Sequence, residues 1–440
     1  MWIVWWLTHL PAIAREGGGT ASPLMTGTLV LTTLALVIAR LAPGARPTPA
    51  WLAGALAGIV SAALNLMLLL SKVAEQAGSN EELATAANQL QDNAFQIIFG
   101  FTAISSIVGA AAGWVGAVAT RRHAHTKPVL WHARLSLVLP LLILPLVVVG
   151  GAVTSTESGM AVPDAVTTYN ALPWLYPIEL MSEPRIFLEH THRLFGWLVG
   201  VGALTIAIWT TIADRRAWAK ALVWGVAIAI GVQGLLGILR VGANEPSFAL
   251  IHGVLAQIVF GAAVVQAALL LLPAAWGLEL LGPTRVAARL LPPISGVAIV
   301  TLLLQLILGA KRRHFGLDAA TWPHAAFSLV VVVALLTAAF VCMRGDRLTQ
   351  PGRTLRRVGL ALAWLIGIQF LLGWATLAVV GGHSADAVPI PVAQELASAH
   401  PIRTLEALVA TAHQANGALL VGLTALAGTL GVCLRRLAAA

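Results

Sequence analysis

Charge is scarce in this chain of 440 residues. Only 10% of the residues are Asp, Glu, Lys or Arg, whereas 58% are hydrophobic, and the mean hydropathy is +0.85. A soluble domain usually carries about 25% charged residues, so the composition excludes a soluble globule. No stretch is polar enough to form a separate soluble domain. The chain is therefore predicted to be an integral, polytopic membrane protein.

Cysteine is also scarce, with only two residues, Cys342 and Cys433. Both lie near the predicted cytoplasmic ends of helices, which argues against a disulfide framework and a thiolate metal motif. Any metal ligands must then come from the twelve histidines. The first residues lack a basic stretch and a small-residue cleavage site, so we expect no removable signal peptide.

The formal net charge of +9 could suggest a nucleic-acid partner. The basic residues lie in short connections between apolar runs, however, where they set topology, so we expect no nucleic-acid binding. Apolar runs of about 20 residues predict membrane-spanning helices. The runs lie at 23–42, 51–71, 95–119, 132–152, 186–213, 221–240, 247–272, 291–310, 322–343, 357–380 and 408–434.

Most of the 27 Lys and Arg residues lie in alternate connections, at 40–50, 121–134, 214–220, 274–290, 344–357 and after 434. The positive-inside rule places these segments and the C-terminus in the cytoplasm, so we expect a multi-pass protein of the cell membrane. The cluster Lys311, Arg312 and Arg313 breaks this rule on the outer side. It fits an anionic partner, such as ligand carboxylates or lipid headgroups, and equally a tolerated interfacial cluster.

The last eight predicted helices contain an internal repeat. IGVQGLLG at 230–237 returns as IGIQFLLG at 366–373, and the stretch from His192 to Phe195 is similar to the stretch from His324 to Phe327. Four helices per repeat keep both halves in one orientation, about an axis along the membrane normal. The expected fold is all-α: two pseudo-twofold-related four-helix transmembrane bundles plus about three extra N-terminal helices. We expect an N-terminal membrane extension at 1–128, a first half at 129–275 and a second half at 276–440.

Each half carries one histidine near the outer end of its second helix and one near the outer end of its fourth. They are His192, His252, His324 and His413. Two imidazoles facing each other inside a four-helix bundle are typical of a haem iron with axial histidines, whereas a bare zinc or copper ion needs three or four converging ligands. We favour haem ligation over purely structural histidines.

Only the first half has charged residues next to a predicted haem ligand. Glu189, His192 and Arg193 fall at i, i+3 and i+4, so a helix places them on one face, whereas the helix of His324 contains no carboxylate. Because a carboxylate at a haem edge can exchange protons, we expect the chemical site in the first half and an electron-carrying haem in the second. Alternatively, Glu189 and Arg193 simply pair at the interface, or Arg193 binds a haem propionate.

Several segments resemble haem A synthase, the membrane enzyme that oxidises a methyl group of haem O to the formyl group of haem A. They are GGAVTSTESGMAVPD at 150–164, EHTHRLFG at 189–196, and the helix entries ALIHGVLAQ and ATAHQANGALLVG. The resemblance covers about residues 129–436. It departs from the family at Asp164-Ala165-Val166, where relatives often have Trp-Pro after the aspartate, and in lacking the outer-loop cysteine pair of some relatives.

This resemblance implies roles for the site residues. It makes His192 and His252 the cofactor-binding pair around the substrate haem O, with Glu189 as the essential catalytic carboxylate. It makes His324 and His413 the axial ligands of a resident haem B. It also implies two hydroxylations of the methyl carbon with oxygen from water, and as a partner the farnesyltransferase that makes haem O.

Two other functions remain open at this point: a di-haem b-type membrane electron carrier, and a non-catalytic haem-binding assembly protein. A carrier that crosses the membrane usually holds its haems at two depths, whereas all four histidines are expected near the outer face. The presence of Glu189 argues against the second alternative, an assembly protein that binds haem without catalysis.

Overall fold

The structure is a computed structural model that describes Trp6 and residues 47–74, 79, 88–119, 131–177, 180–181, 183–271, 280–315, 318–380 and 400–439. Within these residues the chain forms helices and no β-strand. Ten helices are long and apolar enough to cross a membrane. The chain is therefore an all-α, multi-pass membrane protein, as its composition predicts.

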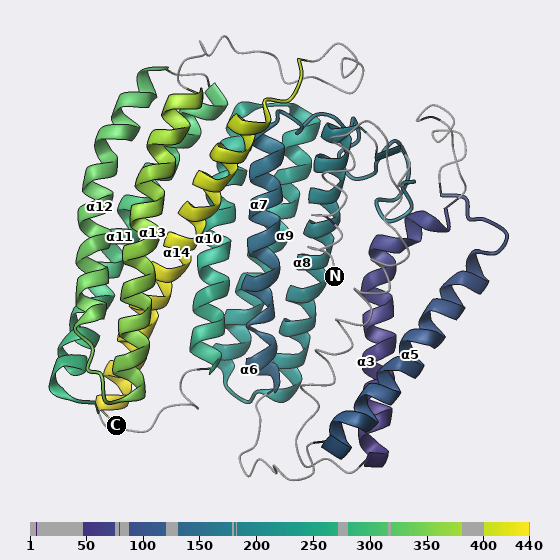
Figure 1. Ribbon diagram of the computed structural model, residues 1–440, viewed down its shortest axis with the longest axis horizontal. Coiled ribbons are helices and arrows are strands. Elements are labelled where there is room, and N and C mark those ends of the chain that lie inside the picture. Colours follow the sequence, from purple (N-terminus) through teal and green to yellow (C-terminus); the bar gives the residue numbers. More distant parts are fainter. Residues whose placement is uncertain are drawn as a thin grey trace. The chain divides into compact units, whose positions relative to one another are not determined.

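The spanning helices match ten of the eleven predicted runs (Figure 1). They are α3 (Pro47–Leu69), α5 (Ala94–Ala119), α7 (Val138–Ser155, after the short α6, Trp131–Leu135), α8 (Pro184–Ala213), α9 (Ala217–Ala243), α10 (Pro246–Leu271), α11 (Gly282–Phe315), α12 (Thr321–Met343), α13 (Gln350–Val380) and α14 (Thr404–Ala439). The predicted run at 23–42 lies outside the described residues.

Helix α11 is longer than predicted at both ends. It begins at Gly282 and continues through Pro292 and Pro293, although proline inside a helix removes hydrogen bonds. Tertiary packing offsets this cost: Leu291 is fully buried, and Gly431 of α14 lies so close that an added Cβ would stand 2.8 Å from Pro292 Cδ. At its other end α11 includes the predicted outer basic cluster.

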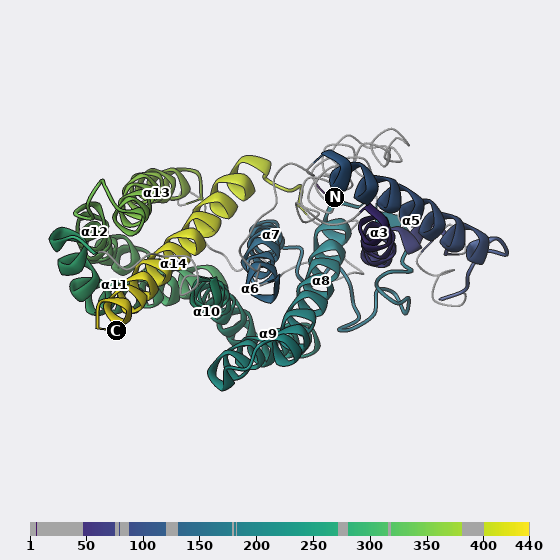
Figure 2. The ribbon, with the colours of Figure 1, turned by 90° about the horizontal axis from the view of Figure 1, so that it is seen from below.

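The described chain divides into two compact units. The first comprises residues 1–129 and 161–194, with α3, α5 and the start of α8. Its helices α3 and α5 lie side by side (Figures 1 and 2) and touch through glycines. A Cβ added at Gly54 or Gly58 of α3 would lie 2.1 Å from the carbonyl oxygen of Gly109 or Ser105 of α5. Such close backbone approach is typical of small-xxx-small packing between membrane helices.

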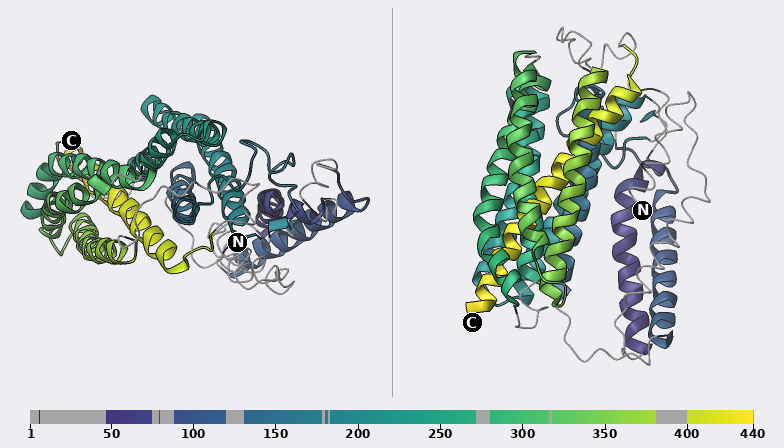
Figure 3. Two further views of the ribbon diagram at one scale, coloured as in Figure 1. Left: turned by 90° about the horizontal axis from the view of Figure 1, so that it is seen from above. Right: turned by 60° about the vertical axis from the view of Figure 1, so that its left-hand side comes forward.

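The second unit comprises residues 130–160 and 195–440, and it contains two apolar cores. One core joins α7, the later turns of α8, α9 and α10. The other joins α11, α12, α13 and α14, where α12 and α14 each pack against both α11 and α13 (Figures 1 and 3). Helix α14 also contacts α7 and α10. Large apolar side chains such as Trp364 and Leu371 are mostly exposed, as expected of helix faces in lipid.

The predicted division of the chain into three parts, at 1–128, 129–275 and 276–440, stays a prediction. The first compact unit takes residues 161–194, which we had placed in the predicted first half.

Candidate functional site

Glu189 and Arg193 form a buried ion pair in the first turns of α8. Arg193 Nη2 donates to Glu189 Oε1 at 2.7 Å, and only 3% of Glu189 is exposed. The shared face predicted from their spacing is confirmed. The second carboxylate oxygen of Glu189 accepts from the backbone N–H of Val162 at 2.8 Å. A buried carboxylate needs such partners, because its desolvation is otherwise costly.

The loop before α8 is fastened to this ion pair. Besides Glu189, Arg193 donates to the backbone carbonyls of Val162 at 3.4 Å and Thr167 at 2.5 Å. The guanidinium thus joins the carboxylate to two points of the loop. This segment contains the end of the GGAVTSTESGMAVPD motif, so two of the four segments that carry the resemblance are in direct contact.

An aromatic cluster lies beside the ion pair, within the same unit. His190 is fully buried, with Nδ1 3.0 Å from Thr168 Oγ1 and its ring 5.0 Å from that of Tyr176. Tyr169 stacks on Tyr176 at 6.0 Å. Burial, together with the negative charges of Glu189 and nearby acidic groups, raises the pKa of Tyr169 to about 12. The phenol is therefore neutral at physiological pH.

The predicted haem ligands fall into two groups. His192 lies half-buried on α8, between Glu189 and Arg193, and belongs to the first compact unit. His252 lies half-buried on α10 of the second unit. Their pairing around one haem stays a prediction. His324 of α12 and His413 of α14, both in the second unit, lie close together with their rings edge to face.

The rings of His324 and His413 are 6.3 Å apart between centroids, with an interplanar angle of 72°. An iron bound by two imidazole nitrogens, each about 2 Å from the metal, requires ring centroids roughly 6 Å apart. His324 Nδ1 also donates to the backbone carbonyl of Gln305 at 3.1 Å, because a carbonyl can only accept. This bond leaves Nε2 as the unprotonated nitrogen, the form that binds iron.

The His324–His413 site fits a bare metal ion less well. Among the described residues, no three His, Cys, Asp or Glu side chains converge in a way that could hold a bare metal ion. Two facing imidazoles without a third ligand fit an iron whose remaining positions are filled by a porphyrin. The residues of the second half therefore suit a haem better than zinc or copper.

Three glycines contact the rings of predicted haem ligands. The glycines that contact histidine rings lie on the preceding helices, at Gly237, Gly309 and Gly373. Two of them end the repeated segments IGVQGLLG and IGIQFLLG. The third ends LLLQLILG at 302–309, a further copy of the same pattern that we did not recognise.

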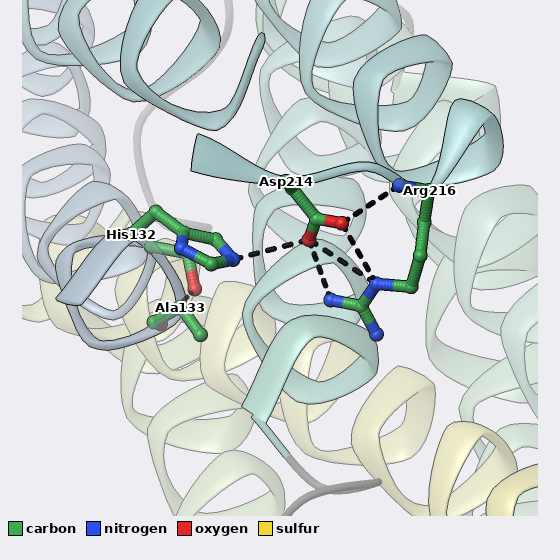
Figure 4. Close-up of polar contacts among 5 residues, drawn as sticks. His132, Ala133, Asp214 and Arg216 are labelled. Atoms are coloured by element: carbon green, nitrogen blue, oxygen red, sulfur yellow. Dashed lines mark hydrogen bonds and ion pairs between the residues drawn. The ribbon is translucent and has the colours of Figure 1, made fainter. Parts of the chain in front are cut away.

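A second polar cluster lies where α8 ends and α9 begins (Figure 4). Asp214, in the α8–α9 connection, is 6% exposed and lies 3.0 Å from His132 Nε2 and 2.6 Å from Arg216 Nη2. The hydrogen bonds from Arg216 hold the pKa of Asp214 well below its ordinary value. The carboxylate ties α6 to the connection between α8 and α9.

The second half has a similar aspartate. Asp346 lies 132 residues after Asp214, the same offset that separates His192 from His324. It joins the start of α11 to the α12–α13 connection, accepting from Thr284 Oγ1 at 2.5 Å and Thr349 N at 2.6 Å. Burial raises its pKa, but these hydrogen bonds outweigh that effect and bring the pKa down to about 2. The two aspartates extend the internal repeat.

Two arginines on the predicted outer side contact the chain itself. Arg313 donates to the backbone carbonyl of Thr154 and lies 3.7 Å from Glu157, and Arg240 donates to the carbonyl of Gly159 at 2.8 Å. At least one member of the basic cluster at the end of α11 therefore holds the loop after α7. An anionic partner for Lys311 and Arg312 stays a prediction.

Comparison with protein-family models, with curated proteins and with solved structures finds no match to this chain.

Proposed function

We propose that this protein is a haem A synthase, an oxidoreductase that converts the methyl group of haem O to the formyl group of haem A for terminal oxidase assembly. In this proposal two pseudo-twofold-related four-helix bundles hold the haems near the outer face of the cell membrane, with a cytoplasmic C-terminus. The substrate haem lies in the first half and a resident haem B in the second.

The observation that carries the haem-binding part is the His324–His413 pair. The separation of the two rings and the tautomer of His324 both suit axial ligation. A haem B bound there supplies one-electron redox chemistry. The protein contributes two half-buried imidazoles from α12 and α14, two helices that share the apolar core of α11 to α14.

The observation that favours an enzyme over an electron carrier is the difference between the halves. His192 lies beside a buried carboxylate, whereas the side chains that surround His324 on α12 are Trp322, Pro323 and Ala325. Oxidation of a methyl to a formyl group with oxygen from water releases four electrons and four protons. Glu189 accepts hydrogen bonds through both oxygens, and an acceptor carboxylate suits a reaction that releases protons.

The experiment is the haem content of the purified protein, produced together with a haem O source. Acid extraction and chromatography would be applied to wild type, Glu189→Gln and Glu183→Gln. Glu183 is a matched control, because it lies at the same helix entry but accepts from the backbone N–H of Ile186. We expect haem B with haem A or an oxidised intermediate in wild type and Glu183→Gln, and haem B with unreacted haem O in Glu189→Gln.

The alternatives predict other results. If wild type holds only haem B, at two equivalents per chain, the protein is a di-haem electron carrier and the proposal is wrong. If haem O is bound but stays unreacted in wild type under conditions that supply an electron acceptor, a haem-binding assembly protein is the better description.

A further inference from the structure

Five of the described helices carry the pattern Gln-x-x-x-Gly, and three of these five precede a helix that carries a predicted haem ligand. The pairs are Gln233 and Gly237 on α9, Gln305 and Gly309 on α11, and Gln369 and Gly373 on α13. The following helices carry His252, His324 and His413, respectively. In all three cases the glycine lies against the imidazole ring, since an added Cβ would stand 3.3 Å or less from its Cε1 atom.

The contacts are reciprocal between α11 and α12. Gln305 Nε2 donates to the backbone carbonyl of His324 at 2.9 Å, while His324 Nδ1 donates to the backbone carbonyl of Gln305 at 3.1 Å. Each residue thus binds the main chain of the other. Together the two bonds determine both the register of α12 against α11 and the direction of the imidazole.

The glycine makes this arrangement possible. In a helix the Cβ of residue i+4 points back over the turn that contains the carbonyl of residue i. With glycine at 309, the carbonyl of Gln305 is open to the ring of His324. An alanine Cβ there would stand 2.9 Å from His324 Cε1, so the ring would have to retreat by about 0.5 Å to reach ordinary van der Waals contact at 3.4 Å.

The pair on α9 repeats the same bond. Gln233 Nε2 donates to the backbone carbonyl of His252 at 2.8 Å, and the glutamine precedes the histidine by 19 residues, as in α11 and α12. On α13 the amide contacts the ring instead: Gln369 Nε2 lies 3.2 Å from His413 Nδ1 and 3.3 Å from Nε2. Asn416 holds the other end of this amide by donating to Gln369 Oε1 at 2.7 Å.

We infer that these glutamine–glycine pairs are positioning residues for the haem ligands, and that Gln305 and Gly309 set the ring orientation and tautomer of His324. This inference rests on the haem-binding part of the proposed function. The pairs contact the histidines themselves, so they act on the geometry of the ligands. Outer partners of metal-bound histidines typically change metal affinity about 10-fold to 100-fold when they are removed.

The test compares Gly309→Ala and Gln305→Leu with wild type and with Gly296→Ala. Gly296 lies on the same helix, but an added Cβ there meets nothing within 4 Å, so it controls for the general effect of alanine in α11. Each variant would be purified and titrated with haem B. The readouts are haem affinity, the electron paramagnetic resonance spectrum of the ferric haem, and its reduction potential.

We expect Gly309→Ala to lose at least about tenfold in haem affinity, with a changed low-spin spectrum or a new high-spin fraction, and Gly296→Ala to match wild type. Gln305→Leu introduces no steric conflict, so it decides the question if Gly309→Ala does not fold, and its spectrum and potential should also shift. Wild-type affinity, spectrum and potential in Gln305→Leu and in any folded Gly309→Ala would overturn the inference alone. A wild-type protein that binds no haem B would overturn the proposed function, and the inference with it.

Discussion

Asp214→Asn tests whether the buried cluster of Figure 4 stabilises the fold. The substitution keeps the size of the side chain but removes its charge. In the native protein the carboxylate lies 3.0 Å from His132 Nε2, 2.6 Å from Arg216 Nη2 and 2.9 Å from the backbone N–H of residue 216. His132 Nε2 and Arg216 Nη2 both contact Oδ2, whereas the backbone N–H and the Nε–H of Arg216 donate to Oδ1. Asparagine replaces one of these two oxygens with an NH2 group, which cannot accept a hydrogen bond.

The expected loss follows from these contacts. A hydrogen bond to a charged group contributes about 1.5–3 kcal/mol, and breaking a buried ion pair by removing one partner costs about 3–5 kcal/mol. The side chain of Arg216 is 35% exposed, so water can replace part of what it loses. We therefore expect the lower end of that range, about 3 kcal/mol in the free energy of unfolding.

The dependence on pH gives a second, independent signature. Because the folded pKa of Asp214 is lowered, its contribution is fully present above the ordinary carboxyl pKa of about 4 and is lost as the pH falls toward the folded value. The stability difference between wild type and Asp214→Asn should thus narrow as the pH falls below about 4.

The measurement is unfolding of the purified protein by titration with sodium dodecyl sulfate, followed by circular dichroism. Glu406→Gln serves as the control, because the Arg403–Glu406 pair is 3.3 Å long but largely exposed on the arginine side, and such surface pairs contribute about 0–1 kcal/mol. If Asp214→Asn unfolds within about 0.5 kcal/mol of wild type at neutral pH, the cluster does not stabilise the fold and the reasoning is wrong.

Two further predictions concern the first unit. In Gly109→Ile the new Cβ would stand 2.2 Å from the carbonyl oxygen of Gly54, so we expect α3 and α5 to separate and become sensitive to limited proteolysis, whereas Gly100→Ile, at a position with nothing within 4 Å, should resist it like wild type. In Tyr176→Phe, Tyr169 is the sole tyrosine, and an ultraviolet titration should give a midpoint near pH 12 rather than near 10. A midpoint near 10 would show that its ring is neither buried nor close to the acidic groups.

Helix positions were predictable because each span satisfies its own backbone hydrogen bonds in lipid. Local hydrophobicity therefore located all ten observed spans. It misplaced the start of α11, because the apolar run begins at 291 whereas the helix begins at Gly282. The packing of Pro292 against α14 depends on residues more than a hundred positions away, which no local signal contains.

The candidate site was predictable to the extent that one helix or the repeat contained it. The spacing of Glu189 and Arg193 predicted their pairing, which the structure confirms. Glu189 contacts Val162, and Asp214 contacts His132. Neither contact was predictable, because no spacing rule connects segments so far apart in the sequence. The glutamine–glycine pattern was visible in two of the repeated segments. Its contact with the histidines could not be predicted, because the histidines lie on the neighbouring helix.

The sequence by itself determined the membrane character of this protein, its helices and the internal repeat, since these follow from hydrophobic length and from similarity along one chain. Only the tertiary structure decided which atoms meet: the rings of His324 and His413 across the core, and the carbonyl of Gln305 uncovered by Gly309. Facing contacts depend on how two helices are rotated and shifted against each other. Packing of the whole unit sets that rotation and shift.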